Sequence, residues 1–215
     1  MFLYFEVIID CSGPEMDEEL LFRVLFIAIY AVFFGVRIRY RVESARREPE
    51  RRQGPESWAS KALIVTILGY LASIILYMFD VPWVSWSRLA LPTWLRWLGA
   101  FVASSSVLLV AWTHRALGRQ YSAEFAIQED HVLVTTGPYA RTRHPMYTAL
   151  NMFSFSMALM TSNFLVLLFA FLEILPFPWI AREEELVLLE AFGEEYREYM
   201  MRTGRFFPRM RQRSS

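Results

Sequence analysis

The chain has 215 residues, of which 55% are hydrophobic and 16% aromatic, and its 22 acidic and 22 basic residues cancel. This length suits one domain, and so high an apolar content is typical of an integral membrane protein surrounded by a lipid bilayer. Cys11 is the only cysteine, which excludes an intramolecular disulfide, a thiolate metal cluster and a two-cysteine redox centre. We therefore expect no bound metal.

Three apolar segments in the first half predict membrane helices: Leu20 to Val36, Ala62 to Phe79 and about Trp97 to Thr113. Each is close to the ~17–25 residues that cross a bilayer. The basic stretch 37–61, broken by Pro49, predicts a cytoplasmic loop by the positive-inside rule. A nucleic-acid-binding patch is the alternative, but a loop between spans needs basic residues for orientation anyway, so we expect no nucleic-acid partner.

Aromatic residues gather between the second and third segments. Four tryptophans lie there: Trp83, Trp86, Trp94 and Trp97. Such a density is typical of the belt at a membrane–water interface, where an amphipathic indole ring anchors the chain. We interpret them as anchors.

A long polar stretch, His114 to His144, predicts a structured cytoplasmic loop. It ends at Pro145, which disfavours the α region for His144 and is itself well placed as the first residue of a helix. His144 is therefore expected at or near an N-cap. The free N–H groups of that helix start, with Arg141 and Arg143 beside them, suit an anion such as a carboxylate or phosphate.

Two further apolar runs, Met146 to Met160 and Phe164 to Ile180, are separated only by residues 161–163. So tight a connection predicts a helical hairpin whose arms pack against each other, although the first arm is short for a full span. The sequence thus predicts an all-α, polytopic membrane protein with about five transmembrane helices. The basic loops place its N-terminus outside and its C-terminus in the cytoplasm.

Glu173 lies in the second arm of this hairpin, near Pro176 and Pro178. An ionisable residue at membrane depth is costly and marks a cavity or pathway, and the prolines are expected to kink the arm and open such a cavity. The alternative is a structural role in which Glu173 is protonated or hydrogen-bonds to Asn151 on the facing arm. We place Asn151 and Glu173 in a candidate substrate cavity.

The segment Ala181 to Gly193 has apolar residues on one helical face, which predicts an amphipathic helix lying along the cytoplasmic surface. It carries three consecutive carboxylates, 183–185. They are either a solvated face favoured by the helix dipole or functional groups, and Arg182 is either an interfacial anchor or part of a site.

Five short motifs in the second half, together covering about residues 115 to 210, resemble the isoprenylcysteine carboxyl methyltransferase family, membrane enzymes grouped with the phospholipid methyltransferases. The matching residues are Leu133-Val134-x-x-Gly137-x-Tyr139, Arg143-His144-Pro145-x-Tyr147, Glu183-Glu184-Glu185-Leu186, Phe192-Gly193-x-x-Tyr196-x-x-Tyr199 and Gly204-Arg205-x-x-Pro208. Each is weak alone, but five in this order and spacing form a strong signal.

The resemblance implies a cytoplasm-facing pocket for S-adenosyl-L-methionine and a lipophilic, prenylated acceptor that enters from the bilayer. Carried over by position, the cofactor-binding candidates are His131, Leu133, Val134, Gly137, Tyr139, His144, Pro145, Tyr147 and Glu184. The catalytic or substrate-orienting candidates are Arg143, Arg182, Glu184 and Glu185.

This chemistry agrees with the residue types. Helix N–H groups and an arginine suit the carboxylate of the cofactor, and glutamates suit its amine and ribose hydroxyls. An acceptor carboxylate is already ionised at neutral pH and needs no general base, so an arginine would act mainly by orienting it. An amine acceptor must arrive deprotonated, and then Glu184 or Glu185 is the candidate base.

We therefore predict a single membrane methyltransferase domain over 1–215, with three membrane helices in 1–113 and the cofactor loop, hairpin and catalytic region in 114–215. Its predicted activity is O-methylation of isoprenylcysteine or a similar lipophilic acid. The alternatives are N-methylation of phosphatidylethanolamine, a sterol- or lipid-reductase relative using a nicotinamide cofactor, and a non-enzymatic lipid-binding membrane protein. No glycine-rich nucleotide fingerprint is present, so a soluble Rossmann-type methyltransferase is not supported.

Overall fold

The computed structural model describes residues 14–47, 57–118 and 132–209. They form α1 (Pro14–Arg47), α2 (Trp58–Met78), η1 (Pro82–Ser87), α3 (Thr93–Leu117), η3 (Gly137–Ala140), α4 (Pro145–Thr161), α5 (Phe164–Leu172) and α6 (Phe177–Arg202). Within these ranges the only β pairing consists of two isolated bridges. The predicted all-α fold is confirmed.

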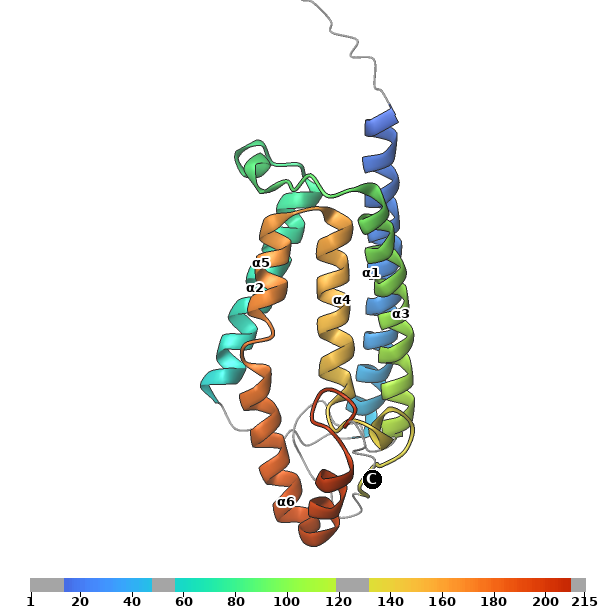
Figure 1. Ribbon diagram of the computed structural model, residues 1–215, viewed down its shortest axis with the longest axis vertical. Coiled ribbons are helices and arrows are strands. Elements are labelled where there is room, and N and C mark those ends of the chain that lie inside the picture. Colours follow the sequence, from blue (N-terminus) through green and yellow to red (C-terminus); the bar gives the residue numbers. More distant parts are fainter. Residues whose placement is uncertain (1–13, 48–56, 119–131, 210–215) are drawn as a thin grey trace, which may run out of the picture.

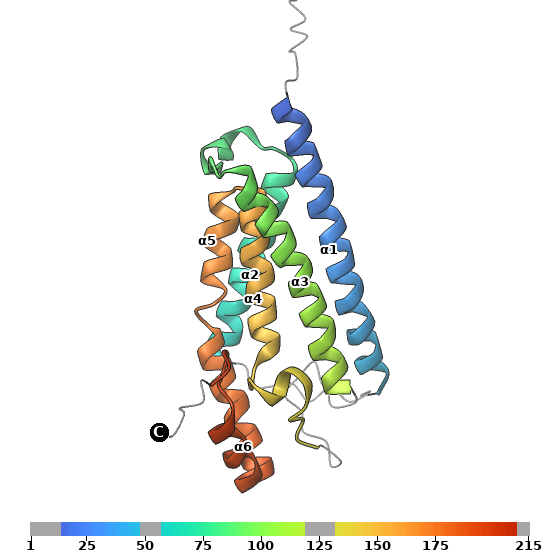
Figure 2. The ribbon, with the colours of Figure 1, turned by 45° about the vertical axis from the view of Figure 1, so that its right-hand side comes forward.

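The long helices form a bundle with α4 at its centre (Figures 1 and 2). Four stretches are long and apolar enough to cross a membrane: Glu18–Glu43, Trp58–Met78, Thr93–Leu117 and Phe164–Arg202. The 17 residues of α4 make it a shorter fifth helix, which runs beside the others through the bundle. The described chain begins at one end of the bundle and finishes at the other (Figure 1). A polytopic membrane fold is thereby confirmed.

The first helix is longer than predicted. We expected a basic loop from Arg37 onward, but α1 continues to Arg47. Residues 37–47 contain neither proline nor glycine, and arginine is a good helix former, so nothing in this stretch ends the helix. The first breaker is Pro49, which lies outside the described residues.

Helices α3 and α4 pack closely because Gly99 has no side chain at their contact. A Cβ at this position would lie 2.7 Å from the carbonyl oxygen of Ser156 and 2.9 Å from the amide nitrogen of Met160. The side chains around this contact form the main buried cluster of the bundle: Phe22, Phe26, Ala100, Ala103, Val107, Phe153, Met157 and Met160.

Gly99→Ala is expected to destabilise the protein by about 1–3 kcal/mol, because the added methyl group meets backbone atoms that move only if α4 shifts. Gly35→Ala is the matched control, since a Cβ there meets nothing within 4 Å. It should stabilise α1 by up to about 1 kcal/mol through helix propensity. Unfolding of both variants by denaturant in detergent micelles measures the difference, and equal effects would contradict the close-packing argument.

The second arm of the predicted hairpin is two helices and not one kinked helix. Asn163 caps α5, accepting hydrogen bonds from Leu165 N at 2.9 Å and Val166 N at 3.2 Å. α5 then ends at Leu172, because Pro176 lacks an amide proton and its ring would clash with the carbonyl four residues earlier. Glu173 lies in the turn that follows, and the chain becomes helical again at Phe177.

The segment predicted to be a separate helix along the membrane surface is part of a longer helix in the structure. Ala181 to Gly193 is the middle of α6, which starts at Phe177 and continues along the long axis of the bundle past the ends of α1 and α3 (Figures 1 and 2). Gly193 has φ +51° and breaks the regular helix, so the last turns to Arg202 take a new direction. The helix therefore carries its carboxylates beneath the bundle and toward the loop before α4.

The tryptophans predicted as anchors are all exposed. Trp83 and Trp86 lie on η1, and Trp94 and Trp97 lie in the first turns of α3. Both elements are at the end of the bundle opposite α6 (Figure 1). Nearby, Arg96 is buried and donates to Glu19 Oε2 at 2.8 Å and to the carbonyl oxygen of Met160 at 2.9 Å, which joins α1, α3 and α4.

Candidate active site

The loop before α4 and the segment after α6 lie side by side through backbone hydrogen bonds. Gly204 N donates to Arg141 O at 3.2 Å, Arg143 N donates to Gly204 O at 2.9 Å, and His144 N donates to Arg205 O at 2.9 Å. Gly204 is required in this turn because a Cβ would lie 1.8 Å from the carbonyl oxygen of Phe207. This pairing joins the second sequence motif to the fifth.

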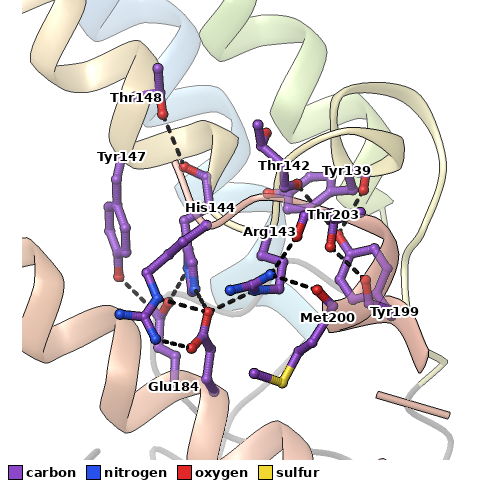
Figure 3. A network of polar contacts seen from close by, with 12 residues as sticks. Tyr139, Thr142, Arg143, His144, Tyr147, Thr148, Glu184, Tyr199, Met200 and Thr203 are labelled. Atoms are coloured by element: carbon purple, nitrogen blue, oxygen red, sulfur yellow. Dashed lines mark hydrogen bonds and ion pairs between the residues drawn. The ribbon is translucent and has the colours of Figure 1, made fainter. Parts of the chain in front are cut away.

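Arg143 makes three hydrogen bonds within the chain, through its Nε and Nη1 atoms (Figure 3). Its Nε donates to Glu185 Oε1 at 2.8 Å, and its Nη1 donates to the carbonyl oxygens of Met200 at 3.2 Å and Thr203 at 2.7 Å. Arg205 contacts the other oxygen of the same carboxylate, Glu185 Oε2, at 2.5 Å. The anion that Arg143 binds is therefore the carboxylate of Glu185, not a ligand on those nitrogens.

His144 lies between Glu184 and Glu185 of α6, and Figure 3 shows its position beside Glu184. Its Nδ1 is 2.9 Å from Glu184 Oε2 and its Nε2 is 3.3 Å from Glu185 Oε1. Carboxylates only accept hydrogen bonds, so this geometry suits an imidazolium with both nitrogens protonated. Burial would lower the pKa of His144, but the hydrogen bonds and charges of Glu184 and Glu185 outweigh it, and the pKa is raised above 6.5.

A raised pKa makes this contact dependent on pH. The stabilisation from protonated His144 is fully present below the unfolded-state pKa of about 6.5 and is lost as pH rises through the higher folded-state pKa. We expect the melting temperature of the unmodified protein in detergent to fall as pH is raised from about 6 to about 9. The melting temperature of His144→Gln should fall by less over the same range. Parallel pH profiles for the two proteins would contradict a charged His144.

Tyr147 completes the network on α4. Its hydroxyl donates to Glu184 Oε1, and its ring stacks on His144 with centroids 5.5 Å apart and packs on Phe177 at 4.7 Å. The side chain of Glu184 is 22% exposed, whereas that of Glu185 is 4% exposed. Glu184 is thus the carboxylate that remains accessible to a ligand, and Glu185 is the buried centre of the ion pairs.

A small cavity of about 90 Å³ lies beside Arg143. Its walls are mainly apolar and aromatic: Leu117, Val132, Leu133, Val134, Tyr139, Arg143, Leu188, Phe192, Tyr196 and Tyr199. Tyr196 is 1% exposed, and its hydroxyl has no hydrogen-bond partner among the described residues. The apolar and aromatic walls of this cavity suit a flat ligand.

A larger cavity of about 450 Å³ lies between α1, α2, α4 and the start of α6. Aromatic and aliphatic side chains form most of its wall, Arg37 and Arg41 lie on α1, and Glu173 is a buried carboxylate in it. Phe177 lines this cavity and also packs on Tyr147, so its side chain lies between the cavity and the network. The alternative partner expected for Glu173 was wrong: its Oε2 accepts from Ser154 Oγ at 2.9 Å, not from Asn151.

The structure brings most of the expected site residues together. One network contains Arg143, His144, Tyr147, Glu184 and Glu185, and the small cavity contains Leu133, Val134 and Tyr139. Pro145 is the first residue of α4 and His144 its N-cap, as predicted. Gly137 has φ +61° and forms the turn that starts η3.

Three candidates are placed elsewhere. Arg182 is exposed on α6 and takes no part in the described network. Asn151 donates to Tyr147 O at 2.9 Å within α4 and does not line the large cavity. His131 lies outside the described residues.

Two participants were not among the candidates. Arg205 binds both oxygens of Glu185, at 3.1 Å from Nε to Oε1 and 2.5 Å from Nη2 to Oε2. Tyr196 lines the small cavity, and its hydroxyl is buried without a partner among the described residues. Both stand in the motifs of the C-terminal half, so the signal was present, but those motifs gave no indication of what either side chain contacts.

Known proteins are similar to parts of this chain in sequence and to most of it in fold. Residues 94–195 match the family model for phospholipid methyltransferases. The cobalt-zinc-cadmium resistance protein CzcN of Cupriavidus metallidurans is 32% identical over 123 residues, which cover 54% of this chain and 55% of that protein. The nickel-cobalt-cadmium resistance protein NccN of Alcaligenes xylosoxydans xylosoxydans is 32% identical over 116 residues, 53% of each protein. The chain thus spans about half the length of these relatives.

Among solved structures, the eukaryotic intramembrane Ras methyltransferase ICMT, an isoprenylcysteine carboxyl methyltransferase, has a similar fold. The TM-score is 0.51 with 20% sequence identity, over 86% of this chain and 67% of that one. This likeness concerns the fold, and the family match covers α3, α4, α5 and most of α6 with the network between them. Residues 94–195 are therefore similar to the phospholipid methyltransferase family, and the chain shares the fold of the isoprenylcysteine carboxyl methyltransferase ICMT.

Proposed function

We propose that the protein is an integral membrane methyltransferase that uses S-adenosyl-L-methionine to O-methylate the carboxylate of isoprenylcysteine or a similar lipophilic acid. The observation that carries this proposal is that motifs spread over residues 133–208 meet at one end of the bundle. There a polar network lies between a small aromatic cavity and a large apolar one. This is the arrangement that a polar cofactor and a lipophilic acceptor require together.

The residues present fit the proposed cofactor. In the small cavity, Leu133, Val134 and Phe192 suit the faces of an adenine ring. Glu184 is partly exposed and suits the amine or ribose hydroxyls of the cofactor. When bound, S-adenosyl-L-methionine supplies a methyl group activated on a positively charged sulfur.

The residues of the chain then have to orient the acceptor and the cofactor. An acceptor carboxylate is ionised at neutral pH, so no residue of the chain has to remove a proton. Arg143 and Arg205 hold Glu185, and through His144 this ion-pair cluster fixes the carboxylate of Glu184 at the edge of the network. Arg143 thus acts as a positioning residue. Preorganised groups of this kind lower a barrier without reorganising during the reaction.

The second candidate is N-methylation of a phospholipid amine, favoured by the family whose model matches residues 94–195. An amine acceptor must lose a proton before it attacks, and Glu184 is the accessible carboxylate for that step. Among the residues described, no three His, Cys, Asp or Glu side chains are grouped so as to hold a metal ion.

The proposal includes an orientation in the membrane. The end of the bundle that carries the network also carries basic residues of α1 and of the loop before α4, Arg37, Arg39, Arg41 and Arg141. By the positive-inside rule this end faces the cytoplasm, with the N-terminus outside. Methylation would then occur at the cytoplasmic side.

A transfer assay tests the proposal. Purified protein is incubated with S-adenosyl-L-methionine labelled on its methyl group, with farnesylcysteine or phosphatidylethanolamine as acceptor. Label released by alkali as volatile methanol indicates a methyl ester, whereas label stable to alkali indicates a methylated amine. Transfer to neither acceptor, with no thermal shift on adding the cofactor, would reject the methyltransferase proposal.

A further inference from the structure

The wall of the large cavity contains one carboxylate whose surroundings leave it incompletely satisfied. Glu173 is 7% exposed, and its Oε2 accepts a hydrogen bond from Ser154 Oγ at 2.9 Å. Within the described residues, its other oxygen, Oε1, accepts no hydrogen bond. A carboxylate oxygen in the wall of a cavity that receives no hydrogen bond from the chain is available to a donor on a ligand.

The two tyrosines beside it do not provide that donor. The hydroxyl of Tyr30 donates to the hydroxyl of Tyr70 at 3.0 Å, and that of Tyr70 donates to the backbone oxygen of Ser154 at 3.3 Å. Each hydroxyl has a single proton, and both protons are directed away from Glu173. Tyr30, Tyr70, Ser154 and Glu173 all line the cavity, so a ligand in it meets a polar site with a free acceptor.

The other end of the same cavity is positively charged. Arg37 and Arg41 line it, and because they lie four residues apart on α1 they share one face of that helix. They are seven and eleven residues beyond Tyr30, which places them about 10 and 16 Å further along the helix. The cavity therefore has cations at one end, an apolar wall in between and a hydrogen-bond acceptor at the far end.

We infer that this cavity selects an elongated lipophilic acid that carries a hydroxyl group at the end far from its carboxylate. The carboxylate lies against Arg37 and Arg41, at the end of the cavity nearest the network. The apolar chain lies along the aromatic wall, and the distal hydroxyl donates to Glu173 Oε1. The inference rests on the proposed function, since it takes the ligand of this cavity to be the methyl acceptor, and it adds a substrate class and makes Glu173 a specificity-determining residue.

The test is a binding comparison that needs no methyl transfer. Lauric acid and its terminally hydroxylated counterpart compete with radiolabelled lauric acid for the purified protein, without cofactor. The hydroxylated acid is expected to bind up to about tenfold more tightly, the upper end of the net contribution of one hydrogen bond. Equal affinities for the unmodified protein would overturn the inference, whether or not any variant folds.

Variants locate the effect. In Glu173→Leu the preference for the hydroxylated acid should disappear, whereas Ser154→Ala, which keeps the acceptor, should retain it. Arg37→Leu should weaken the binding of both acids by the same factor. A preference that persists in Glu173→Leu would place the hydroxyl elsewhere and reject the assignment. A preference in binding with no methyl transfer to farnesylcysteine, phosphatidylethanolamine or either fatty acid would reject the proposed activity and leave the cavity assignment standing.

Discussion

Glu185→Ala is expected to lower the free energy of unfolding by about 3–5 kcal/mol, the largest effect of any single substitution that we consider. The carboxylate of Glu185 is 4% exposed and is shared by Arg143, Arg205 and His144 at 2.5–3.3 Å. Its removal leaves a guanidinium that is only 10% exposed, that of Arg143, without its counter-charge. A buried charge that has lost its partner costs far more than the pair contributes.

The matched control for Glu185 lies on the same helix. Glu194→Ala removes a carboxylate that also pairs with an arginine, Arg197 at 3.1 Å, but the two side chains are 70% and 67% exposed. Exposed pairs of this kind contribute less than about 1 kcal/mol. Unfolding by SDS titration in mixed micelles measures both variants. If Glu185→Ala lowers the free energy of unfolding by no more than Glu194→Ala does, the network does not stabilise the C-terminal region.

Glu184→Gln is expected to reduce kcat/KM for methyl transfer on the order of 100-fold or more, while the protein stays folded. Glutamine has the volume of glutamate and its oxygen still accepts from Tyr147, so little packing is lost. The substitution removes the accessible negative charge and turns an NH₂ group toward His144 Nδ1, which is 2.9 Å from the present carboxylate. The transfer assay measures activity, and thermal unfolding in detergent verifies the fold.

Glu190→Gln is the control for this effect, because Glu190 is exposed on the same helix and outside the network. Its activity should equal that of the unmodified protein. If Glu184→Gln retains near-normal activity, Glu184 serves the structure of the network only, and the accessible carboxylate of the site has to be sought elsewhere. If it loses activity and also unfolds, the loss says nothing about catalysis, and Tyr147→Phe, which removes one donor to Glu184 but no charge, replaces it as the test.

Sequence patterns predicted the helices well and their ends poorly. Apolar runs of spanning length placed α2, α3 and α4 nearly correctly, because a membrane helix must be apolar over its whole length. The ends of α1 and α5 were missed for opposite reasons. α1 runs on into polar residues because nothing breaks it, and α5 stops inside an apolar run because Pro176 does.

The sequence by itself also selected most, but not all, of the residues of the candidate site. Arg143, His144, Tyr147, Glu184 and Glu185 were selected from motifs, and they meet in one network. Only the tertiary structure decided how they are paired. Arg143 and Glu185 are 42 residues apart in the chain, and nothing local to either residue states that their charges neutralise each other.

That pairing decides what each residue is able to do. From the sequence, Arg143 was a free cation ready for a ligand carboxylate, but folding commits its guanidinium to Glu185 and to two carbonyl oxygens. Glu184 and Glu185 are adjacent in sequence, yet one side chain is 22% exposed and the other 4% exposed. The sequence specifies the chemical groups and their order. Burial and counter-charges arise from contacts between distant segments, and it is these contacts that determine which group remains available to a substrate.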